Sequence, residues 1–558
     1  MKLQVQILLS IILITTLLLS ACGPITNLLP KGSVTISIVY GSEKREWLEP
    51  LVEEFNNAKN KTEEGMVIVV EAEPMGSIES VHGIIDGTLQ PTIWSPASSV
   101  YIPVANAEWR KNHSDDLVTD TPNDLVLSPV VIAMWQPMAQ ALGWPNNEIG
   151  WAEIAALATS EKGWSAYGHP EWGRFQFGHT HPEYSNSGIV SIIAEAYAGA
   201  NKQRGLTQED LQTPEIIEFM SAVEKSVIHY GTSTGFFADR MFERGPSYLS
   251  AAVLYENLIV AQESKRLSGE SSQIPVVAIY PKEGTFWSNH PYAVLNAPWV
   301  TPEQKEAANI FEAFLLDKPQ QLKSLEFGFR PADPSIPLAS PLDTRHGIDI
   351  NQPKTILEVP SATVINGIQN LWQETKKPVD LIVVMDVSGS MSGDKITTAR
   401  SSLMQFVEKL DNRDRLQIIL FSTDITTLTP LTSLGEKRQQ VLDSVSGIFE
   451  QGDTRLYDAT LTAYQSLLKN GDPDHIRSIV VLTDGKDTLS SNSLGQIMGQ
   501  INATANEGGN AIKIFTIAFG SNADRDILIK IAEPTGGKQY DSSPENIQKI
   551  YDEIATFF

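Results

Sequence analysis

Two stretches of the chain alternate short apolar runs with segments whose apolar positions repeat at helical spacing. In the first stretch, from 33 to about 338, a β-branched run at 34–40 precedes apolar residues at 47, 48, 51, 52 and 55. A second run at 66–70 and a third that leads into 94–99 continue the alternation. Repeated strand–loop–helix units of this kind predict a parallel sheet covered by helices.

The pattern restarts at 379 with a run, 379–385, that is apolar except for Asp380 and is typical of a strand buried on both faces. Further strands are predicted at 416–421, 479–482 and 512–519, with helices at 396–410 and 459–468. Between the two stretches, residues 339–378 are less regular, and we interpret them as a linker with one short helix near 363–374. The chain therefore divides into an α/β domain at 33–338, a linker at 339–378 and a second α/β domain at 379–558.

Composition and charge narrow the possible functions. The chain has 558 residues, with 42 Lys and Arg against 67 Asp and Glu, and a net charge of −25. So acidic a surface repels phosphate backbones and anionic lipid, and we expect no nucleic-acid partner. A hydrophobic content of 42% excludes wholesale disorder.

The first 22 residues, MKLQVQILLSIILITTLLLSAC, have a basic start and an apolar run, as a secretory signal has. Their end, Leu19-Ser20-Ala21-Cys22, resembles a bacterial lipobox and contains the only cysteine of the chain. The resemblance implies cleavage before Cys22 and its lipidation, with 23–32 as a tether and the rest facing the extracytoplasmic side of the membrane, in a periplasm or at a cell surface. The alternative is an uncleaved membrane helix with a chance cysteine.

Three segments of the second domain carry candidate metal ligands. Asp386-Val-Ser388-Gly-Ser390 directly follows a predicted strand, Thr454 lies in a loop, and Asp484 closes another strand. This set resembles the metal-ion-dependent adhesion site of the von Willebrand factor A family. The resemblance implies a Rossmann-like fold, a divalent ion held by these five residues, and a protein partner whose Asp or Glu completes the coordination.

The chemistry of the five residues agrees with a hard cation. Mg²⁺ takes oxygen ligands in an octahedron, which hydroxyls bound directly and carboxylates bound through waters can supply. Ligand type does not separate Mg²⁺ from Mn²⁺ or Ca²⁺. The alternative is that 386–390 only makes a turn and a helix cap.

Several segments of the first domain, among them 128–135, 178–188, 278–285 and 304–308, resemble bacterial extracytoplasmic solute-binding proteins of the two-lobed type. The resemblance implies two α/β lobes that close over a ligand. We expect crossovers near 127–134 and 275–281, with lobe one at 33–126 plus 282–338 and lobe two at 135–274.

Polar residues at strand ends and helix starts are the candidate cleft residues. Hydroxyl and free N–H groups there favour a small polar or anionic solute. The candidates are Gly41, Ser42, Gly76, Ser77 and Ser98 of lobe one, Ser185, Asn186 and Ser187 of lobe two, and Tyr280. The alternative is that each serine only caps its helix. His179, His181 and Glu183 alternate, so they either share one strand face as metal ligands or are hydrogen-bonded polar residues beside the cleft.

The chain has no G-x-x-x-x-G-K-[ST] and no H-E-x-x-H motif, and we expect no enzyme. The sequence predicts a lipid-anchored binding protein that captures a solute and binds a protein through a metal ion. Two alternatives stay open: an adhesion protein whose solute-binding fold has lost its ligand, and the solute receptor of an ABC permease.

Overall fold

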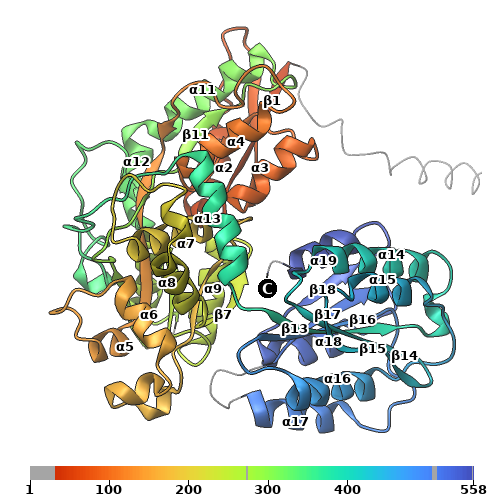
Figure 1. Ribbon diagram of the computed structural model, residues 1–558. Coiled ribbons are helices and arrows are strands. Elements are labelled where there is room, and N and C mark those ends of the chain that lie inside the picture. The colour runs from red at the N-terminus through yellow and green to blue at the C-terminus, as the bar shows by residue number, and fades with distance from the viewer. Residues whose placement is uncertain (1–31, 272–273, 506–511, 556, 558) are drawn as a thin grey trace, which may run out of the picture.

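A computed structural model describes residues 32–271, 274–505, 512–555 and 557. The predicted signal, Cys22 and all of the tether except Gly32 lie outside the described residues. Within the described ranges no helix combines the length and the apolar character that a membrane span requires. Figure 1 shows two α/β bodies, one from 33 to about 375 and one from 379 onward.

Lobe one is built on a sheet of order β2-β1-β3-β11-β4. The strands are β1 (Ser33–Gly41), β2 (Val67–Met75), β3 (Ile93–Ser95), β4 (Asn123–Asp124) and β11 (Pro291–Val294). The first three are parallel, as predicted, and β11 returns antiparallel. The helix α2 (Arg45–Ala58) buries the predicted apolar positions, and Phe55 packs 4.9 Å, centroid to centroid, from Phe311 of α11 (Pro302–Leu316).

Lobe two is built on β5 (Val126–Trp135), which is fully paired along its length. Its partners are β8 (Ala251–Tyr255), β9 (Val276–Ile279), β10 (Trp287–Ser288) and β12 (Arg330–Pro331), and β6 (Phe177–Thr180) and β7 (Val227–Gly231) complete the sheet. The two expected crossovers coincide with β5 and β9. The chain returns to lobe one only at β11, later than the expected residue 282, because β10 still pairs with β5.

Helices surround the lobe-two sheet. They include α7 (Asn186–Gly199), α8 (Pro214–Glu224), α9 (Thr234–Arg244) and α10 (Glu256–Ser268). Every residue of the α7 helix from Asn186 to Tyr197 is buried. This helix packs against α8 and against β6.

The predicted linker differs from the expectation of a connection between domains, because most of it packs on the solute-binding fold. Its helix, α13 (Ala362–Thr375), contacts α7 and α8, and Trp372 is fully buried. Thr285 exchanges backbone hydrogen bonds with Thr355 and Leu357 over 2.9–3.1 Å. The free connection to the next domain is therefore only a few residues long.

The second domain, here the A domain, has a six-stranded sheet of order β15-β14-β13-β16-β17-β18. The four strands predicted from sequence are β13 (Val379–Asp386), β14 (Arg415–Phe421), β16 (Ile476–Thr483) and β17 (Lys513–Phe519). Two edge strands, β15 (Ile425–Ser433) and β18 (Gln539–Ser542), were not predicted. Helices cover both faces (Figure 1). They are α14 (Asp394–Lys409), α15 (Arg438–Ser446) and α19 (Ile547–Ala555) on one face and α16 (Leu456–Asn470), α17 (Leu494–Ala505) and α18 (Arg525–Ala532) on the other.

Candidate metal site and inter-lobe contact

The predicted metal ligands of the A domain meet at the carboxyl ends of β13 and β16. Asp386 ends β13, and Asp484 follows the last residue of β16. The backbone N–H of Ser388 donates to Asp386 Oδ1 over 2.8 Å. The hydroxyl of Ser390 lies 3.0 Å from that of Ser388 and donates to Asp484 Oδ1 over 2.6 Å. Hydrogen bonds therefore connect four of the five residues in series, from Asp386 to Asp484.

Thr454 reaches the same place from the loop before α16. A Cβ on Gly485 would lie 3.6 Å from Thr454 Oγ1 and 3.7 Å from Ser390 Oγ, so the bare glycine stands between the two hydroxyls. The carbonyl oxygen of Thr454 accepts backbone N–H groups from Thr488 and Leu489, which fixes the loop. The structure thus brings all five predicted residues together.

The charges of this site favour a cation. Burial raises the pKa of Asp386 to about 6, and the nearby carboxylate of Asp484 acts in the same direction. Thr483 opposes that shift by donating to Asp386 Oδ2 over 2.6 Å. The ammonium of Lys395, in the first turn of α14, contacts Asp484 Oδ2. Two buried carboxylates and three hydroxyls facing one point are the oxygen donors that a hard divalent cation takes, so the residues fit such an ion.

Two contributors to this site escaped the sequence analysis. Thr483 could have been noticed, because it precedes Asp484 at the end of the same strand. Lys395 gave no signal, since a lysine in the first turn of a helix is ordinarily a solvated residue. A surface hollow beside Ser390 and Asp484 is lined by the loop 521–526, so the site opens to solvent.

Most of the predicted cleft residues lie where the two lobes touch, which we call the inter-lobe contact. Ser98 of lobe one donates to Asn186 Oδ1 over 2.7 Å, and Asn186 Nδ2 donates to the hydroxyl of Tyr255 over 3.0 Å. Ser42 lies 2.9 Å, oxygen to oxygen, from Ser233 of lobe two. The polar groups of the two lobes therefore satisfy one another in this closed arrangement.

Backbone atoms add to the inter-lobe contact. The first turn of α3 (Ser77–Asp86) in lobe one points its N–H groups of Ile78 and Glu79 at the carbonyl oxygen of Tyr184 in lobe two, both over 3.0 Å. A Cβ on Gly76 would lie 2.5 Å from that same oxygen. The approach of the two backbones requires the glycine.

The other predicted cleft residues have partners within their own lobe. Ser77 accepts from the N–H of Ala97 over 3.0 Å. Ser185 and Ser187 lie 3.2 and 2.9 Å, oxygen to oxygen, from Thr234. The sequence analysis missed Ser233, Thr234 and Tyr255. Nothing in the sequence indicates that the end of β8 and the start of α9 lie opposite lobe one.

Two of the predicted cleft residues are not part of the contact. Beside Gly41 lies the carboxylate of Glu43, from the same lobe. Tyr280 donates its hydroxyl to Glu256, which also pairs with Arg330 over 2.7 Å, and it lines a different cavity with Trp144 and Ile348. The Tyr280 ring therefore lies beside the Glu256–Arg330 ion pair of lobe two.

A cavity of about 480 Å³ opens between the lobes beside Ser42. Lobe one contributes Arg45 and Glu46 to its wall, and lobe two contributes Asp239 and Lys265. Ion pairs bridge the lobes here, with Arg45 3.6 Å from Asp239 and Lys265 3.2 Å from Glu46, measured between charged atoms. Both lobes line the cavity, which carries charged side chains from each lobe beside apolar ones such as Trp47 and Phe242.

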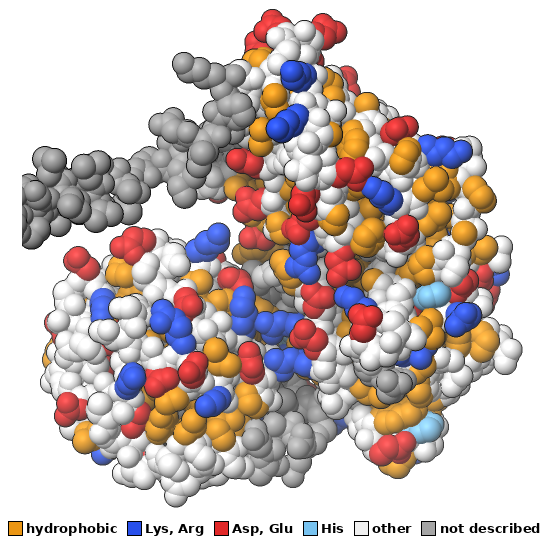
Figure 2. All heavy atoms as spheres, turned by 180° about the vertical axis from the view of Figure 1, so that it is seen from behind, with side chains coloured by type: hydrophobic (Ala, Val, Ile, Leu, Met, Phe, Trp, Pro, Cys, Tyr) orange, Lys and Arg blue, Asp and Glu red, His pale blue; other side chains and the backbone are white. Residues whose placement is uncertain are grey.

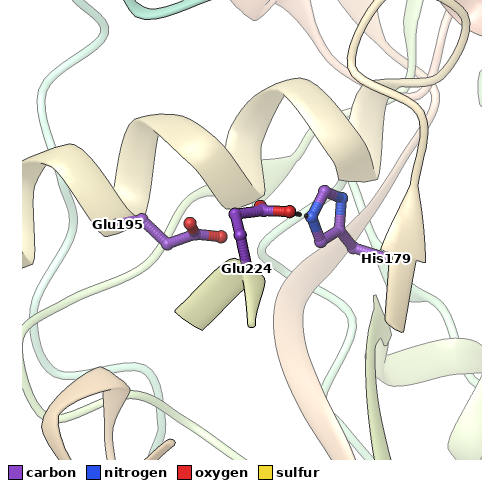
Figure 3. Close-up of side chains that lie close together, drawn as sticks. All are labelled: His179, Glu195 and Glu224. Carbon is purple, nitrogen blue, oxygen red and sulfur yellow. Dashed lines mark hydrogen bonds and ion pairs between the residues drawn. The ribbon is translucent and has the colours of Figure 1, made fainter. Parts of the chain in front are cut away.

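Of the two interpretations of His179, His181 and Glu183, the shared metal-binding face is not formed, and the three side chains are hydrogen-bonded. His181 lies against Trp372, 4.8 Å between ring centroids, and Glu183 accepts from Gln373 over 2.8 Å. The structure instead places His179 beside Glu195 and Glu224, neither of which the sequence indicated (Figure 3). The residues that join His179 come from α7 and α8, whose register against β6 is a tertiary property.

Two family profiles match the chain. The profile of the von Willebrand factor type A domain matches residues 380–553, and that of the bacterial extracellular solute-binding protein matches residues 36–330. The inter-alpha-trypsin inhibitor heavy chain H4 of Homo sapiens is 28% identical over 193 residues, which are 32% of this chain and 20% of that protein. The chain thus spans about a fifth of the length of the curated relatives it matches.

Solved structures resemble each part separately. The von Willebrand factor type A protein from Catenulispora acidiphila is 19% identical, with 32% of this chain and 42% of that chain covered and a TM-score of 0.29. The periplasmic binding protein AfuA from Actinobacillus pleuropneumoniae is 11% identical, with 62% of this chain and 99% of that chain covered and a TM-score of 0.43.

The predicted fold class is confirmed in both parts, and the solute-binding profile covers more than half of the chain. An extracellular solute-binding family implies a place outside the cytoplasm. The chain belongs to the bacterial extracellular solute-binding protein family, and a von Willebrand factor type A domain follows its solute-binding domain.

Proposed function

We propose that this protein is a membrane-anchored extracytoplasmic binding protein that holds a protein partner through a divalent cation at its A domain and captures a small polar or anionic solute between its lobes. The observation that carries the proposal is the convergence of Asp386, Ser388, Ser390, Thr454 and Asp484 at one solvent-facing edge of the sheet. No catalytic role is part of it.

At the A domain, the chain's own residues form a cation-binding site. Ser388, Ser390 and Thr454 offer neutral oxygens, and Asp386 and Asp484 supply negative charge from buried positions. A bound Mg²⁺, Mn²⁺ or Ca²⁺ would supply an electrophilic centre for a carboxylate oxygen. The open hollow beside Ser390 gives an Asp or Glu of the partner access to that centre.

Between the lobes, the proposed solute site is the cavity beside Ser42. Its paired charges, Arg45 with Asp239 and Lys265 with Glu46, come one from each lobe. A polar or anionic solute that exchanges one of these pairs for its own contacts would be bound by both lobes at once. Cys22 is the proposed lipid anchor, which rests on the lipobox resemblance alone.

Thermal unfolding of the full chain tests both binding activities. We expect Mg²⁺ to raise the unfolding temperature of the A domain relative to EDTA, and a specific oxyanion, sugar or amino acid to raise that of the solute-binding domain, since ligands stabilise the state that binds them. Asp386→Ala should abolish the Mg²⁺ effect, whereas the exposed Asp424→Ala should not. A Mg²⁺ effect that survives in Asp386→Ala would contradict the metal site.

A second function is an adhesion protein whose solute-binding fold no longer binds a ligand. The cross-lobe hydrogen bonds Ser98–Asn186 and Ser42–Ser233 favour it, because the polar groups of the two lobes already satisfy one another. No stabilisation by any solute of the panel, together with the Mg²⁺ effect, would support this function. Stabilisation of the solute-binding domain by a solute would instead support solute binding. The captured solute could then be delivered to a permease.

A further inference from the structure

A histidine and two glutamates meet inside lobe two, apart from both sites described above. His179 lies on β6, Glu195 on α7, and Glu224 at the end of α8 (Figure 3). All three side chains are fully buried, and one ligand atom from each lies within 4.8 Å of the other two. Two carboxylates that are buried away from water must be neutralised by a positive charge or by protonation.

Each of the three side chains already has a partner on its outer side. His179 Nδ1 lies 2.7 Å from the carbonyl oxygen of Thr180, to which it donates. In the neutral ring Nε2 then carries the lone pair, and in the protonated ring Nε2 donates to Glu224. The hydroxyl of Tyr230 donates to Glu224 Oε2 over 2.5 Å, and that of Ser191 donates to Glu195 Oε1 over 3.1 Å. Outer contacts of this kind are what orient the ligands of metal sites.

On the inner side, ligand atoms of the three residues face one another. His179 Nε2 faces Glu224 Oε1 at 3.0 Å, and Glu195 Oε2 is buried without a hydrogen-bond partner. In Figure 3 the Glu195 carboxylate points toward Glu224. A divalent cation among these atoms would be bound by all three and would neutralise both carboxylates.

We propose that His179, Glu195 and Glu224 form a buried structural site for Zn²⁺ in lobe two. One imidazole and two carboxylates are ligands that zinc takes, and a carboxylate that binds through both oxygens would complete four-coordination. Since all three side chains are fully buried, the ion enters when the lobe folds and is shielded from chelators afterwards.

The test is metal analysis of the full chain, produced in zinc-supplemented medium and then dialysed against EDTA. Dialysis should strip the open A-domain site and leave about one zinc per chain. Glu195→Gln, which keeps size and shape, should lower the retained zinc to near zero, whereas Glu183→Gln, a partly buried carboxylate on the following loop, should retain it. Wild-type protein prepared with Co²⁺ should show visible absorption bands that Glu195→Gln lacks.

Two outcomes would overturn the proposal. The first is a wild-type chain that retains no zinc and takes up no Co²⁺. The second is equal metal retention in wild type and Glu195→Gln. In either case Glu195 would hold a proton in place of a metal.

An independent observation concerns the junction of the two domains, where a cavity of about 890 Å³ lies between lobe two and the A domain. Among the described residues that line it are five Lys or Arg and three Glu, in a chain of net charge −25. The five are Arg174, Arg244, Lys377, Arg477 and Lys513. In Figure 2, Lys and Arg side chains gather along the seam between the domains.

Lys513 of β17 is the residue that points to a ligand. It is 5% exposed, and within the described parts of the chain its ammonium has no hydrogen-bond partner. The ring centroid of Tyr248 is 5.3 Å away. Burial lowers the pKa of Lys513 well below its ordinary value, and Arg244, Arg240 and Lys377 add repulsion. A buried cation among other cations is unfavourable without an anion.

We infer that this cavity binds a small tetrahedral oxyanion, which is held by Lys513 of the A domain, Lys377 of the connection between the domains and Arg244 of lobe two. Arg244 is already aligned across the seam, because its Nη1 donates to the carbonyl oxygen of Glu533 over 3.0 Å. An anion here would join the two domains through charges that otherwise repel.

The probe is inorganic phosphate, with sulfate as a second oxyanion and NaCl at matched ionic strength. We expect either oxyanion, but not NaCl, to raise the unfolding temperature of the full chain. Lys513→Met should abolish this effect and raise the unfolding temperature without phosphate, since it removes a buried charge. The exposed Lys469→Met should behave as wild type. A phosphate effect of wild-type size in Lys513→Met, or none in wild type, would overturn the inference.

Discussion

The ammonium of Lys395 contacts the Asp484 carboxylate that we assign to the A-domain metal site. The Asp484 side chain is fully buried, whereas that of Lys395 is 30% exposed and starts from the first turn of α14. The lysine therefore places a positive charge beside the carboxylate that a divalent cation would use, and it can swing away into solvent. Cation and lysine compete for one carboxylate.

Lys395→Met should therefore increase the affinity for Mg²⁺. A partly exposed ion pair contributes about 1 kcal/mol, so we expect an increase of roughly 3-fold to 10-fold. Isothermal titration of the full chain with Mg²⁺ measures it, with the exposed Lys437→Met as control. A decrease in affinity would mean that Lys395 holds Asp484 in its binding orientation.

Gly76→Ala should push the lobes apart. The new Cβ would lie 2.5 Å from the carbonyl oxygen of Tyr184 and 2.9 Å from that of Thr232, both in the backbone of lobe two. The backbone of Gly76 itself, at φ −61°, accepts alanine. Small-angle X-ray scattering should report a larger radius of gyration than for wild type. Gly499→Ala, where the added carbon meets nothing within 4 Å, should leave the scattering unchanged.

Trp372→Ala should destabilise the solute-binding domain, because α13 packs as part of it. The Trp372 ring is fully buried, 4.8 Å from His181 and 5.2 Å from Tyr230 between centroids. Removing a buried tryptophan lowers the free energy of unfolding by about 3–5 kcal/mol. Denaturant unfolding followed by circular dichroism measures it. If residues 362–375 were a free linker, the loss would be no larger than for the exposed Leu322→Ala.

Acid should destabilise lobe one through His290. This fully buried side chain lies 3.2 Å from Lys44 and 3.3 Å from Glu43, between ring nitrogen and charged atom. Burial, with Lys44 acting in the same direction, lowers the pKa of His290 to about 4. Between pH 6.5 and 4 the unfolded chain binds a proton that the folded chain excludes, so stability is lost as the pH falls, by roughly 3 kcal/mol.

Glu43 acts in the same direction at lower pH. Burial opposes its ionisation, but Lys44 and His290 outweigh burial and lower its pKa to about 2, so its contribution is lost as the pH falls below about 4.5. His290→Asn should flatten the upper part of the pH dependence, and asparagine tolerates the left-handed backbone there, at φ 43°. Unfolding midpoints of both proteins from pH 8 to pH 4 measure the difference. Parallel profiles would exclude His290 as the cause.

Local pattern was enough to predict the central elements of both domains. The buried strands β13, β14, β16 and β17 each contain an apolar run, and such runs identify strands covered on both faces. The edge strands β15 and β18 were missed. They are short or half exposed, β15 includes Pro430, and polar edge strands resemble loops in sequence.

The A-domain metal residues could also be predicted, for a geometric reason. Asp386 and Asp484 each follow a strand of one parallel sheet, and the carboxyl ends of neighbouring parallel strands lie at the same edge. Once the strands are known, these two residues must be neighbours. The same rule predicted that Gly and Ser residues at the ends of β1 and β2 lie near the cleft between the lobes.

Only the tertiary structure decided which groups face one another across packed surfaces. Glu195 and Glu224 join His179 because α7 packs on β6 and α8 packs on α7. Lys513 meets Arg244 because two domains are in contact, and Ser98 meets Asn186 because two lobes are closed. The period of a helix or strand in the sequence tells which face is buried. It does not tell what that face meets, because that depends on the packing of elements far apart in the chain.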